Sequence, residues 1–317
     1  MKLKELQQQL KENIGRVIIG KDEVVELILN ALVNQGHVLL ESVPGTGKTM
    51  LAKSIAKLID GDFKRIQFTP DVLPSDVTGI HFFNPKEQQF ELRVGPVVTN
   101  VLLADEINRA TPRTQSSLLE VMEEKQVTID GKTIKIEQPF IVIATQNPIE
   151  SQQGTFDLPE AQMDRFFMKI NIGYPTFEDE RQMMQVYKTE EPIQSLLPII
   201  NKEDLLALQQ QVKNVHISDA VETYLLSIIY GTRDHQDIEV GVSPRGTLAL
   251  MRASQAKALI SGRDYVIPED VKAMAPYILS HRLVLSLEAS TKKNEKEVLE
   301  DVLSLVEVPV EVGVEKR

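Results

Sequence analysis

A short apolar run followed by a glycine-rich loop and a helix constrains this chain more than any other feature. The run "HVLL" at 37–40 reads as a buried strand, and "ESVPGTGKTM" at 41–50 follows it directly. Leu51, Ile55 and Leu58 then recur at helical spacing. Strand, loop and helix in this order are the setting in which a loop ending in Gly-Lys-Thr binds phosphate. The stretch therefore predicts a phosphate-binding loop.

The residue types in this loop suit a nucleotide. Gly45 and Gly47 let backbone N–H groups turn inward, and the start of the following helix adds donors and a positive dipole. We expect Lys48 to reach the outer phosphates and Thr49 to bind Mg²⁺. The general pattern G-x-x-x-x-G-K-[ST] departs at its first position, where this chain has Ser42. The residues expected to contact the nucleotide are Pro44, Gly45, Thr46, Gly47, Lys48, Thr49 and Met50.

Two strings typical of GTP-binding proteins also occur, but their surroundings argue against that class. "DVTG" at 76–79 follows a proline-broken loop, whereas the switch aspartate of a GTPase caps an apolar strand. "NKED" at 201–204 opens a predicted helix, in which Asn201 is a good N-cap and the acids suit the first turn. We interpret both strings as chance matches.

Two further apolar strands end in polar side chains. "NVLLADEINRA" places Asp105 and Glu106 after the run 101–104, and "FIVIATQNP" ends in polar residues at 145–147. Adjacent strand residues point to opposite faces, so the two acids are expected to divide the work. Asp105 would hold the magnesium shell, and Glu106 would polarise the attacking water. An amide at the end of the second strand could help to orient that water.

With these motifs in order, the chain resembles the MoxR family of AAA+ ATPases from about residue 14 to about residue 310. The strings that carry the resemblance are "VIIGKDEVVELILNALVNQGHVLLESVPGTGKT", "LPSDVTG", "GPVVTNVLLADEINRATPRTQSSLLEVMEEKQVTIDG", "ATQNPIESQQGTFDLPEAQMDRFF" and "VSPRGTLALMRASQAKALISGRDYVIPEDVKAMAPYILSHRL". The resemblance implies a motor that needs ATP and Mg²⁺ and assembles as a ring, usually a hexamer.

The resemblance also implies roles for single residues outside the loop. Asn147 matches the first sensor of the γ-phosphate, and Arg245 in "SPR" matches the second sensor, on the lid. Arg165 in "EAQMDRFF" matches the arginine finger offered to the ATP of the next subunit. Gln67 is a weaker match to the polar residue that gates the catalytic glutamate. The residues expected near the adenine are Ile18, Ile19 and Gly20.

The surroundings of the two arginines allow a second interpretation of each. Ser243 is a natural N-cap and Pro244 a natural first helical residue, so Arg245 falls in the first turn. The helix dipole disfavours a cation there, and either a phosphate or a local acid would offset the cost. Arg165 would by default pair with the neighbouring Asp164, and the family match favours the subunit interface instead.

The order of the predicted elements indicates the α/β class and two domains. Residues 1–172 are expected to form an AAA+ P-loop core, a parallel sheet between helices. Residues 177–310 are expected to form a small all-helical lid, after the linker "GYPT" at 173–176. Two β-hairpin insertions are predicted in the core, one over 79–95 and one around the Asp-Gly turn at 130–131.

The composition limits the classes of partner that we expect for this protein. The net charge of −11 weighs against nucleic acid, and the absence of cysteine excludes disulfides and thiolate chemistry. There is no signal-peptide core and no apolar run that spans a bilayer, so we expect a cytoplasmic protein without membrane insertion.

The leading interpretation is a ring ATPase that remodels or matures another protein, which family resemblance suggests could carry a von Willebrand factor A domain. The sequence leaves three alternatives open. They are a nucleic-acid motor on the same fold, a magnesium-chelatase-like motor subunit, and a nucleotide-binding scaffold with negligible turnover.

Overall fold

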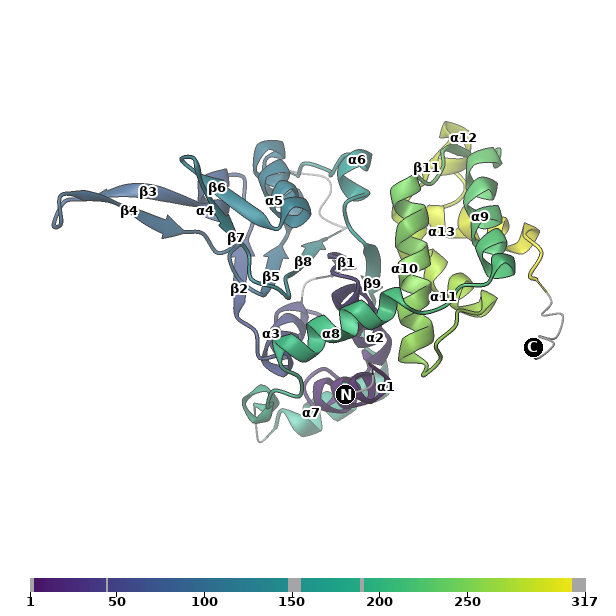
Figure 1. The fold of residues 1–317 in the computed structure, drawn as a ribbon, viewed down its shortest axis with the longest axis horizontal. Helices are drawn as coiled ribbons and strands as arrows, with labels where there is room; N and C mark the ends of the chain where they lie inside the picture. Colours follow the sequence, from purple (N-terminus) through teal and green to yellow (C-terminus); the bar gives the residue numbers. More distant parts are fainter. Residues whose placement is uncertain (1–2, 44, 148–154, 189–190, 310–317) are drawn as a thin grey trace. The chain divides into compact units, whose positions relative to one another are not determined.

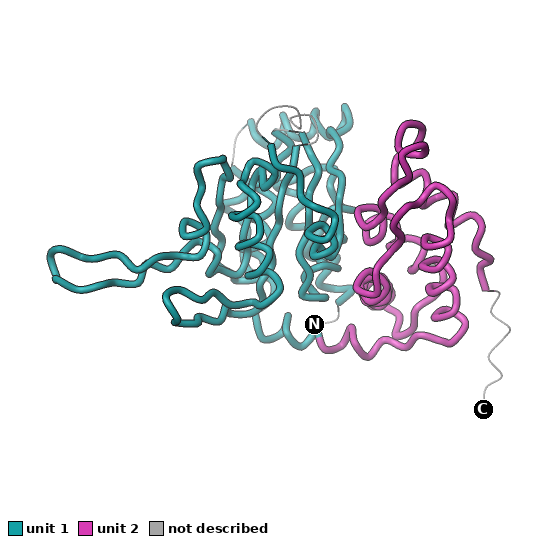
Figure 2. The backbone as a smooth tube through the Cα atoms, turned by 90° about the horizontal axis from the view of Figure 1, so that it is seen from above, with its two compact units in different colours: residues 1–209 teal, residues 210–317 magenta. Residues whose placement is uncertain are grey.

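The computed structural model describes residues 3–43, 45–147, 155–188 and 191–309 of the 317-residue chain. The chain divides into two compact units, residues 1–209 and residues 210–317 (Figure 2). Within the described ranges, every helix is too short or too polar to cross a membrane.

The first unit is built on a five-stranded parallel sheet with the strand order β2-β5-β8-β1-β9. Its strands are β1 (Val38–Ser42), β2 (Phe63–Gln67), β5 (Val101–Asp105), β8 (Ile141–Gln146) and β9 (Met168–Ile172). The interior strand β5 is buried along its whole length, as expected for a strand covered on both faces. The predicted parallel sheet is therefore confirmed, and the carboxyl ends of its strands meet at one edge.

Helices flank this sheet (Figure 1). In the first unit they are α1 (Leu3–Gly15), α2 (Asp22–Val33), α3 (Lys48–Leu58), α4 (Pro74–Thr78), α5 (Pro112–Glu124), α6 (Glu160–Met163), α7 (Phe177–Val186) and most of α8 (Lys202–Lys213), with 3-10 turns η1 (Ile107–Arg109) and η3 (Pro192–Ser195). Leu118 and Met122 of α5 pack in one buried cluster with Leu39, Ala104 and Ala144 of the sheet. Helix α3 contacts β5 and β2, and α2 contacts β9.

Both predicted hairpin insertions are present. They are β3 (Gly79–Asn84) with β4 (Gln89–Val94), and β6 (Gln126–Ile129) with β7 (Lys132–Lys135). In the second hairpin Asp130 and Gly131 both have positive φ, 48° and 82°, as a tight two-residue turn requires. The β3–β4 hairpin extends well away from the sheet (Figure 1), and Phe82, Phe83 and Phe90 are exposed on it.

The second unit is mainly helical, as predicted. Its elements are α9 (Asp219–Asp234), α10 (Pro244–Ile260), α11 (Pro268–Leu279), α12 (Leu287–Ser290) and α13 (Glu295–Leu305), with η4 (Ser280–Arg282) and the strands β10 (Ile238–Val240) and β11 (Val284–Leu285). The Ser243 hydroxyl accepts a hydrogen bond from the N–H of Gly246, which confirms the predicted cap of α10. The antiparallel pair β10–β11 is an addition to the predicted helical pattern.

The boundary between the units falls later than the predicted linker at 173–176. Helix α7 and the segment after it bond to the first unit. The Tyr187 hydroxyl donates to the Val17 carbonyl at 2.7 Å, and the Gln209 amide donates to the Leu32 carbonyl at 3.0 Å. Because these hydrogen bonds join segments more than 150 residues apart, α7, predicted as the first lid helix, belongs to the core unit.

A buried histidine joins the sheet to α5. The His37 Nε2 atom donates to the Met122 carbonyl at 3.0 Å, and its Nδ1 atom accepts from the Val142 N–H at 2.9 Å. This pairing requires the neutral ring, since a protonated ring has no acceptor. Burial accordingly lowers the pKa of His37 to about 4.

We expect this histidine to make folding stability depend on pH. The unfolded chain binds a proton near pH 6.5 and the folded chain only near pH 4, so stability is lost as the pH falls through that interval. The full loss is about 3 kcal/mol. Urea unfolding of the wild type and of His37→Gln, at about pH 7 and about pH 4.5, would measure it. The variant should lose less stability over that interval, and equal losses would contradict the prediction.

Candidate functional site

The loop between β1 and α3 has the backbone that phosphate binding requires. Gly45 and Gly47 have positive φ angles of 83° and 84°, a conformation that L side chains rarely adopt. A Cβ atom on Gly45 would meet no described atom within 4 Å, so the loop is open on that side. Gly47 precedes the first turn of α3, whose unpaired N–H groups attract an anion. The predicted contact Pro44 lies outside the described residues.

The loop and the strand ends face a common cavity of about 390 Å³. Its lining residues are Gly45, Thr46, Gly47, Lys48, Thr49, Met50, Arg65, Gln67, Asp105 and Glu106. All belong to the first unit. The structure thus brings together the predicted loop contacts from Gly45 to Met50 and both predicted acids, Asp105 and Glu106.

The Asp105 carboxylate accepts hydrogen bonds from two side chains at this edge of the sheet. The Thr145 hydroxyl, at the end of β8, donates to Oδ1 at 2.6 Å, and the Arg65 guanidinium donates to Oδ2 at 2.7 Å. The same Thr145 hydroxyl accepts from the N–H of Glu106 at 2.9 Å. One side chain from β8 therefore positions both acids, and Asp105 is only 7% exposed.

Glu106 leaves the strand in a left-handed conformation, with φ 57° and ψ 50°. Residues other than glycine adopt it at a cost, and such outliers gather at functional sites. The Glu106 carboxylate accepts from the Gln67 amide at 2.8 Å and pairs with Arg109 Nε at 3.2 Å. Contacts with Gln67 and Arg109 thus fix the orientation of the Glu106 side chain.

A second cavity of about 570 Å³ shares Gly45, Thr46, Gly47 and Met50 with the first. Its other lining residues are Val17, Ile18, Ile19, Lys21, Tyr174, Pro175, Glu180, Met183, Met184 and Tyr187. The apolar side chains among them suit a flat base. Ile18 and Ile19, the residues expected near the adenine, line this cavity. Gly20 does not line the cavity: it has φ 72° and lies against Asp179 instead. The methionines of α7 and Tyr187, which follows that helix, were missed because this segment was expected to belong to the lid.

The remaining predicted residues lie outside these two cavities. Asn147 directly follows β8 at the same edge of the sheet and is buried. Arg165 follows α6 and pairs with Glu123 of α5 at 3.2 Å. Arg245 is exposed in the first turn of α10, in the second unit. The roles predicted for these three residues stay predictions.

One residue of the phosphate cavity was missed by the sequence analysis. Arg65 shares a face of β2 with Gln67, two positions along, and both reach the strand ends from the neighbouring strand. The alternation in "FKRIQ" was a signal that could have identified it, because Gln67 had already been singled out.

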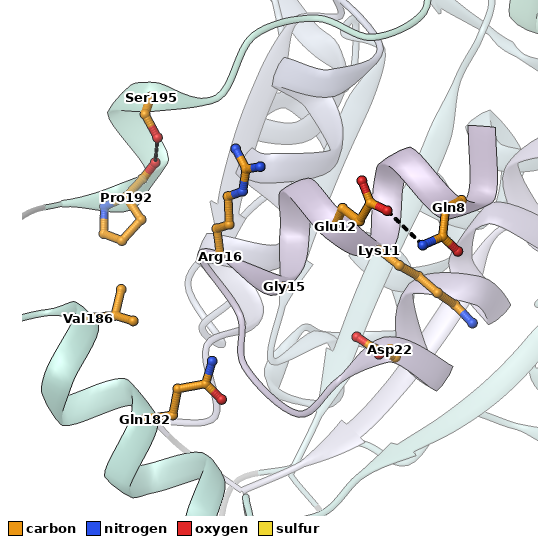
Figure 3. Close-up of a pocket in the computed structure, with 10 residues that line it drawn as sticks. All are labelled: Gln8, Lys11, Glu12, Gly15, Arg16, Asp22, Gln182, Val186, Pro192 and Ser195. Atoms are coloured by element: carbon orange, nitrogen blue, oxygen red, sulfur yellow. Dashed lines mark hydrogen bonds between the residues drawn. The ribbon is translucent and has the colours of Figure 1, made fainter. Parts of the chain in front are cut away.

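A separate cavity of about 570 Å³ lies in the first unit (Figure 3). It is lined by Gln8, Lys11, Glu12, Gly15, Arg16, Asp22, Gln182, Val186, Pro192 and Ser195, from α1, α2, α7 and η3. Lys11 pairs with Glu26 at 2.8 Å, and Gln8 donates to Glu12 at 2.7 Å. None of these described lining residues belongs to the phosphate loop or the strand ends, so we treat the cavity as distinct from the site.

The fold and the site define an AAA-type ATPase domain followed by a lid, and comparison with known proteins agrees. Residues 37–168 match the ATPase family associated with various cellular activities (AAA), and residues 230–302 match the AAA lid domain. A crystal structure of a Cytophaga hutchinsonii protein, assigned as an ATPase, superposes with a TM-score of 0.90 at 38% identity, covering 97% of this chain and 96% of that one.

Relatives give the family within that class. The chain is 42% identical over 306 residues to chaperone MoxR1 of Mycobacterium tuberculosis, covering 93% of this chain and 80% of the relative. It is 50% identical over 301 residues to the Bacillus subtilis protein YeaC, covering 95% and 94%. The chain therefore belongs to the MoxR family of AAA+ ATPases, as the motifs predicted.

Proposed function

We propose that the protein binds ATP with Mg²⁺ at this edge of the sheet and couples hydrolysis, in a ring of identical subunits, to remodelling or maturation of a partner protein. The observation that carries the proposal is the common cavity, which the phosphate loop shares with Asp105 and Glu106. Open glycines, a helix N-terminus, a lysine and two carboxylates in one cavity are a fit for a magnesium nucleotide.

In this proposal the phosphates lie over the loop. The N–H groups after Gly45 and the Lys48 ammonium bind the phosphate oxygens, and Thr49 with Asp105 holds Mg²⁺. When bound, the metal neutralises charge on the phosphates. Glu106 accepts a proton from the attacking water, and Asn147 supplies a polar group at the same sheet edge.

The base is proposed to enter the second cavity. Ile18 and Ile19 line it, together with Met183 of α7 and Tyr187, the residue that follows this helix. The Tyr187 hydroxyl bonds the Val17 carbonyl, so the helix and the base-side loop are tied together. Thioether and aromatic side chains pack well against a flat π-system.

Two arginines outside the cavities are proposed to contact the phosphates of ATP, one in its own chain and one in a neighbouring subunit. Arg245, in the first turn of α10, would bring the lid to the γ-phosphate, as the match of "SPR" to the second sensor of the family implies. Arg165 would act on the ATP of a neighbouring subunit, because it is about one-third exposed and does not line the phosphate cavity of its own chain.

For the partner we favour a protein client over a nucleic acid. The net charge of −11 opposes a polyanion, and Asp130 and Glu137 offset Lys132 and Lys135 in the β6–β7 hairpin. One relative is named a chaperone. We propose a cytoplasmic ring, hexameric by family resemblance, whose client could carry a von Willebrand factor A domain. A magnesium-chelatase-like motor remains the alternative.

Phosphate release from ATP with Mg²⁺ tests the proposal. We expect the wild type to hydrolyse ATP with a specific activity that rises with protein concentration, because assembled rings complete the site. Lys48→Ala, which removes the cation between the outer phosphates, should be inactive. Single- and double-stranded polynucleotides should leave the rate unchanged. Stimulation by a polynucleotide would favour the nucleic-acid motor, and an inert wild type would favour the scaffold.

A further inference from the structure

Arg65 donates a hydrogen bond to the Asp105 carboxylate oxygen that Thr145 does not contact. The Oδ1 atom of Asp105 accepts from Thr145, and Oδ2 accepts from the Arg65 guanidinium at 2.7 Å. Arg65 projects from β2 into the cavity and is 44% exposed, whereas the Asp105 side chain is 10% exposed. The partly buried carboxylate is therefore neutralised by a cation that can move into solvent.

The same guanidinium is connected to the second acid. Arg65 Nη2 also donates to the side-chain oxygen Oε1 of Gln67, and Nε2 of the same side chain donates to the Glu106 carboxylate at 2.8 Å. The contacts form a chain that runs from Asp105 through Arg65 and Gln67 to Glu106, and Glu106 also pairs with Arg109 Nε at 3.2 Å. Each of the two carboxylates thus has an arginine partner.

The ion pair between Arg65 and Asp105 affects how Asp105 can bind a metal. A carboxylate that joins a Mg²⁺ shell, directly or through water, presents an oxygen to the metal or its water. On Asp105 the oxygen that Thr145 leaves is the one that Arg65 holds. Two cations at one carboxylate oxygen repel each other, so the arginine and the metal compete for it.

We propose that Arg65 is a positioning residue that holds Asp105 and, through Gln67, Glu106 while the site lacks metal, and that it leaves Oδ2 of Asp105 when Mg²⁺ binds. The inference rests on the proposed function, because it concerns the same magnesium nucleotide site. Release of Oδ2 removes one of the two contacts of Arg65, so the orientation of Gln67 and Glu106 depends on whether metal is present. Arg65 thus lowers the affinity for metal and links metal loading to the water-activating glutamate.

Binding of a fluorescent, non-hydrolysable ATP analogue tests this without turnover. Its Kd is measured in EDTA and in saturating Mg²⁺ for the full-length wild type, Arg65→Gln and Lys64→Gln. The Kd in EDTA divided by the Kd in Mg²⁺ measures how strongly metal and nucleotide assist each other's binding. With the competing cation removed, the ratio should rise about fivefold in Arg65→Gln, the factor expected of an ion pair with one partly exposed partner.

Lys64→Gln is the matched control. It removes the same charge from the same strand, but Lys64 points to the other face, where its ammonium donates to the Val98 carbonyl. Its ratio should equal that of the wild type. A ratio that is unchanged or lower in Arg65→Gln would overturn the inference, even if the variant is less stable. If the wild type binds no analogue under either condition, the proposed function itself fails.

Discussion

Arg165→Ala should bind ATP and assemble normally but hydrolyse ATP about 10³–10⁵ times more slowly than the wild type. A guanidinium supplied by a neighbouring subunit stabilises charge on the transferring phosphoryl group, and this range is typical of its loss. Arg165 follows α6, is about one-third exposed and does not line the phosphate cavity of its own chain. That placement suits a residue that faces the nucleotide of another subunit.

Mixing two inactive variants distinguishes an active site that is shared between subunits from a loss of activity caused by damage to the variant's own fold. Arg165→Ala keeps its phosphate loop, and Lys48→Ala keeps its arginine. Hybrid rings then contain interfaces where an intact loop faces an intact arginine, so activity should return on mixing and depend on protein concentration. Normal hydrolysis by Arg165→Ala, or full specific activity of a monomeric wild type, would contradict the shared site.

Glu123→Gln controls for the ion pair that Arg165 makes within its own chain. This substitution removes the carboxylate at 3.2 Å from the guanidinium and leaves Arg165 itself in place. An exposed pair of this kind contributes at most about 1 kcal/mol, so the variant should fold and hydrolyse ATP close to the wild-type rate. If Glu123→Gln were as slow as Arg165→Ala, the arginine would be acting through the ion pair.

The sheet, the hairpins and the phosphate loop could be predicted because each depends on a local pattern. β5 is one unbroken apolar run that ends in two acids, and a strand buried on both faces has that composition. The Asp-Gly turn fixed the β6–β7 hairpin by its need for two positive φ angles. In the second unit, Ser243 and Pro244 indicated where α10 begins.

Other features depend on contacts between distant segments, which no local pattern contains. Helix α7 belongs to the core unit because of bonds such as that from Tyr187 to Val17, not because of its own composition. The alternation in "FKRIQ" places Arg65 on the same face as Gln67, but its contact with Asp105 depends on the pairing of β2 with β5. The pairing of Arg165 with Glu123 is likewise set by the approach of α6 to α5.

Glu106 is the group that we propose activates water at a nucleotide held by the loop. Glu106→Gln keeps the volume of the side chain and a polar oxygen, but it cannot accept the proton. We expect ATP binding close to that of the wild type and hydrolysis slower by about 10²–10⁴-fold, the usual contribution of a general base. Glu120→Gln, on the exposed face of α5, removes the same charge away from the cavity and should change neither quantity.

The most direct measurement is therefore ATP binding and phosphate release, determined side by side for the wild type, Glu106→Gln and Glu120→Gln. The predicted result is a Glu106→Gln protein that binds ATP and retains it, with wild-type behaviour in the control. A Glu106→Gln protein that turns over ATP at the wild-type rate would contradict the account.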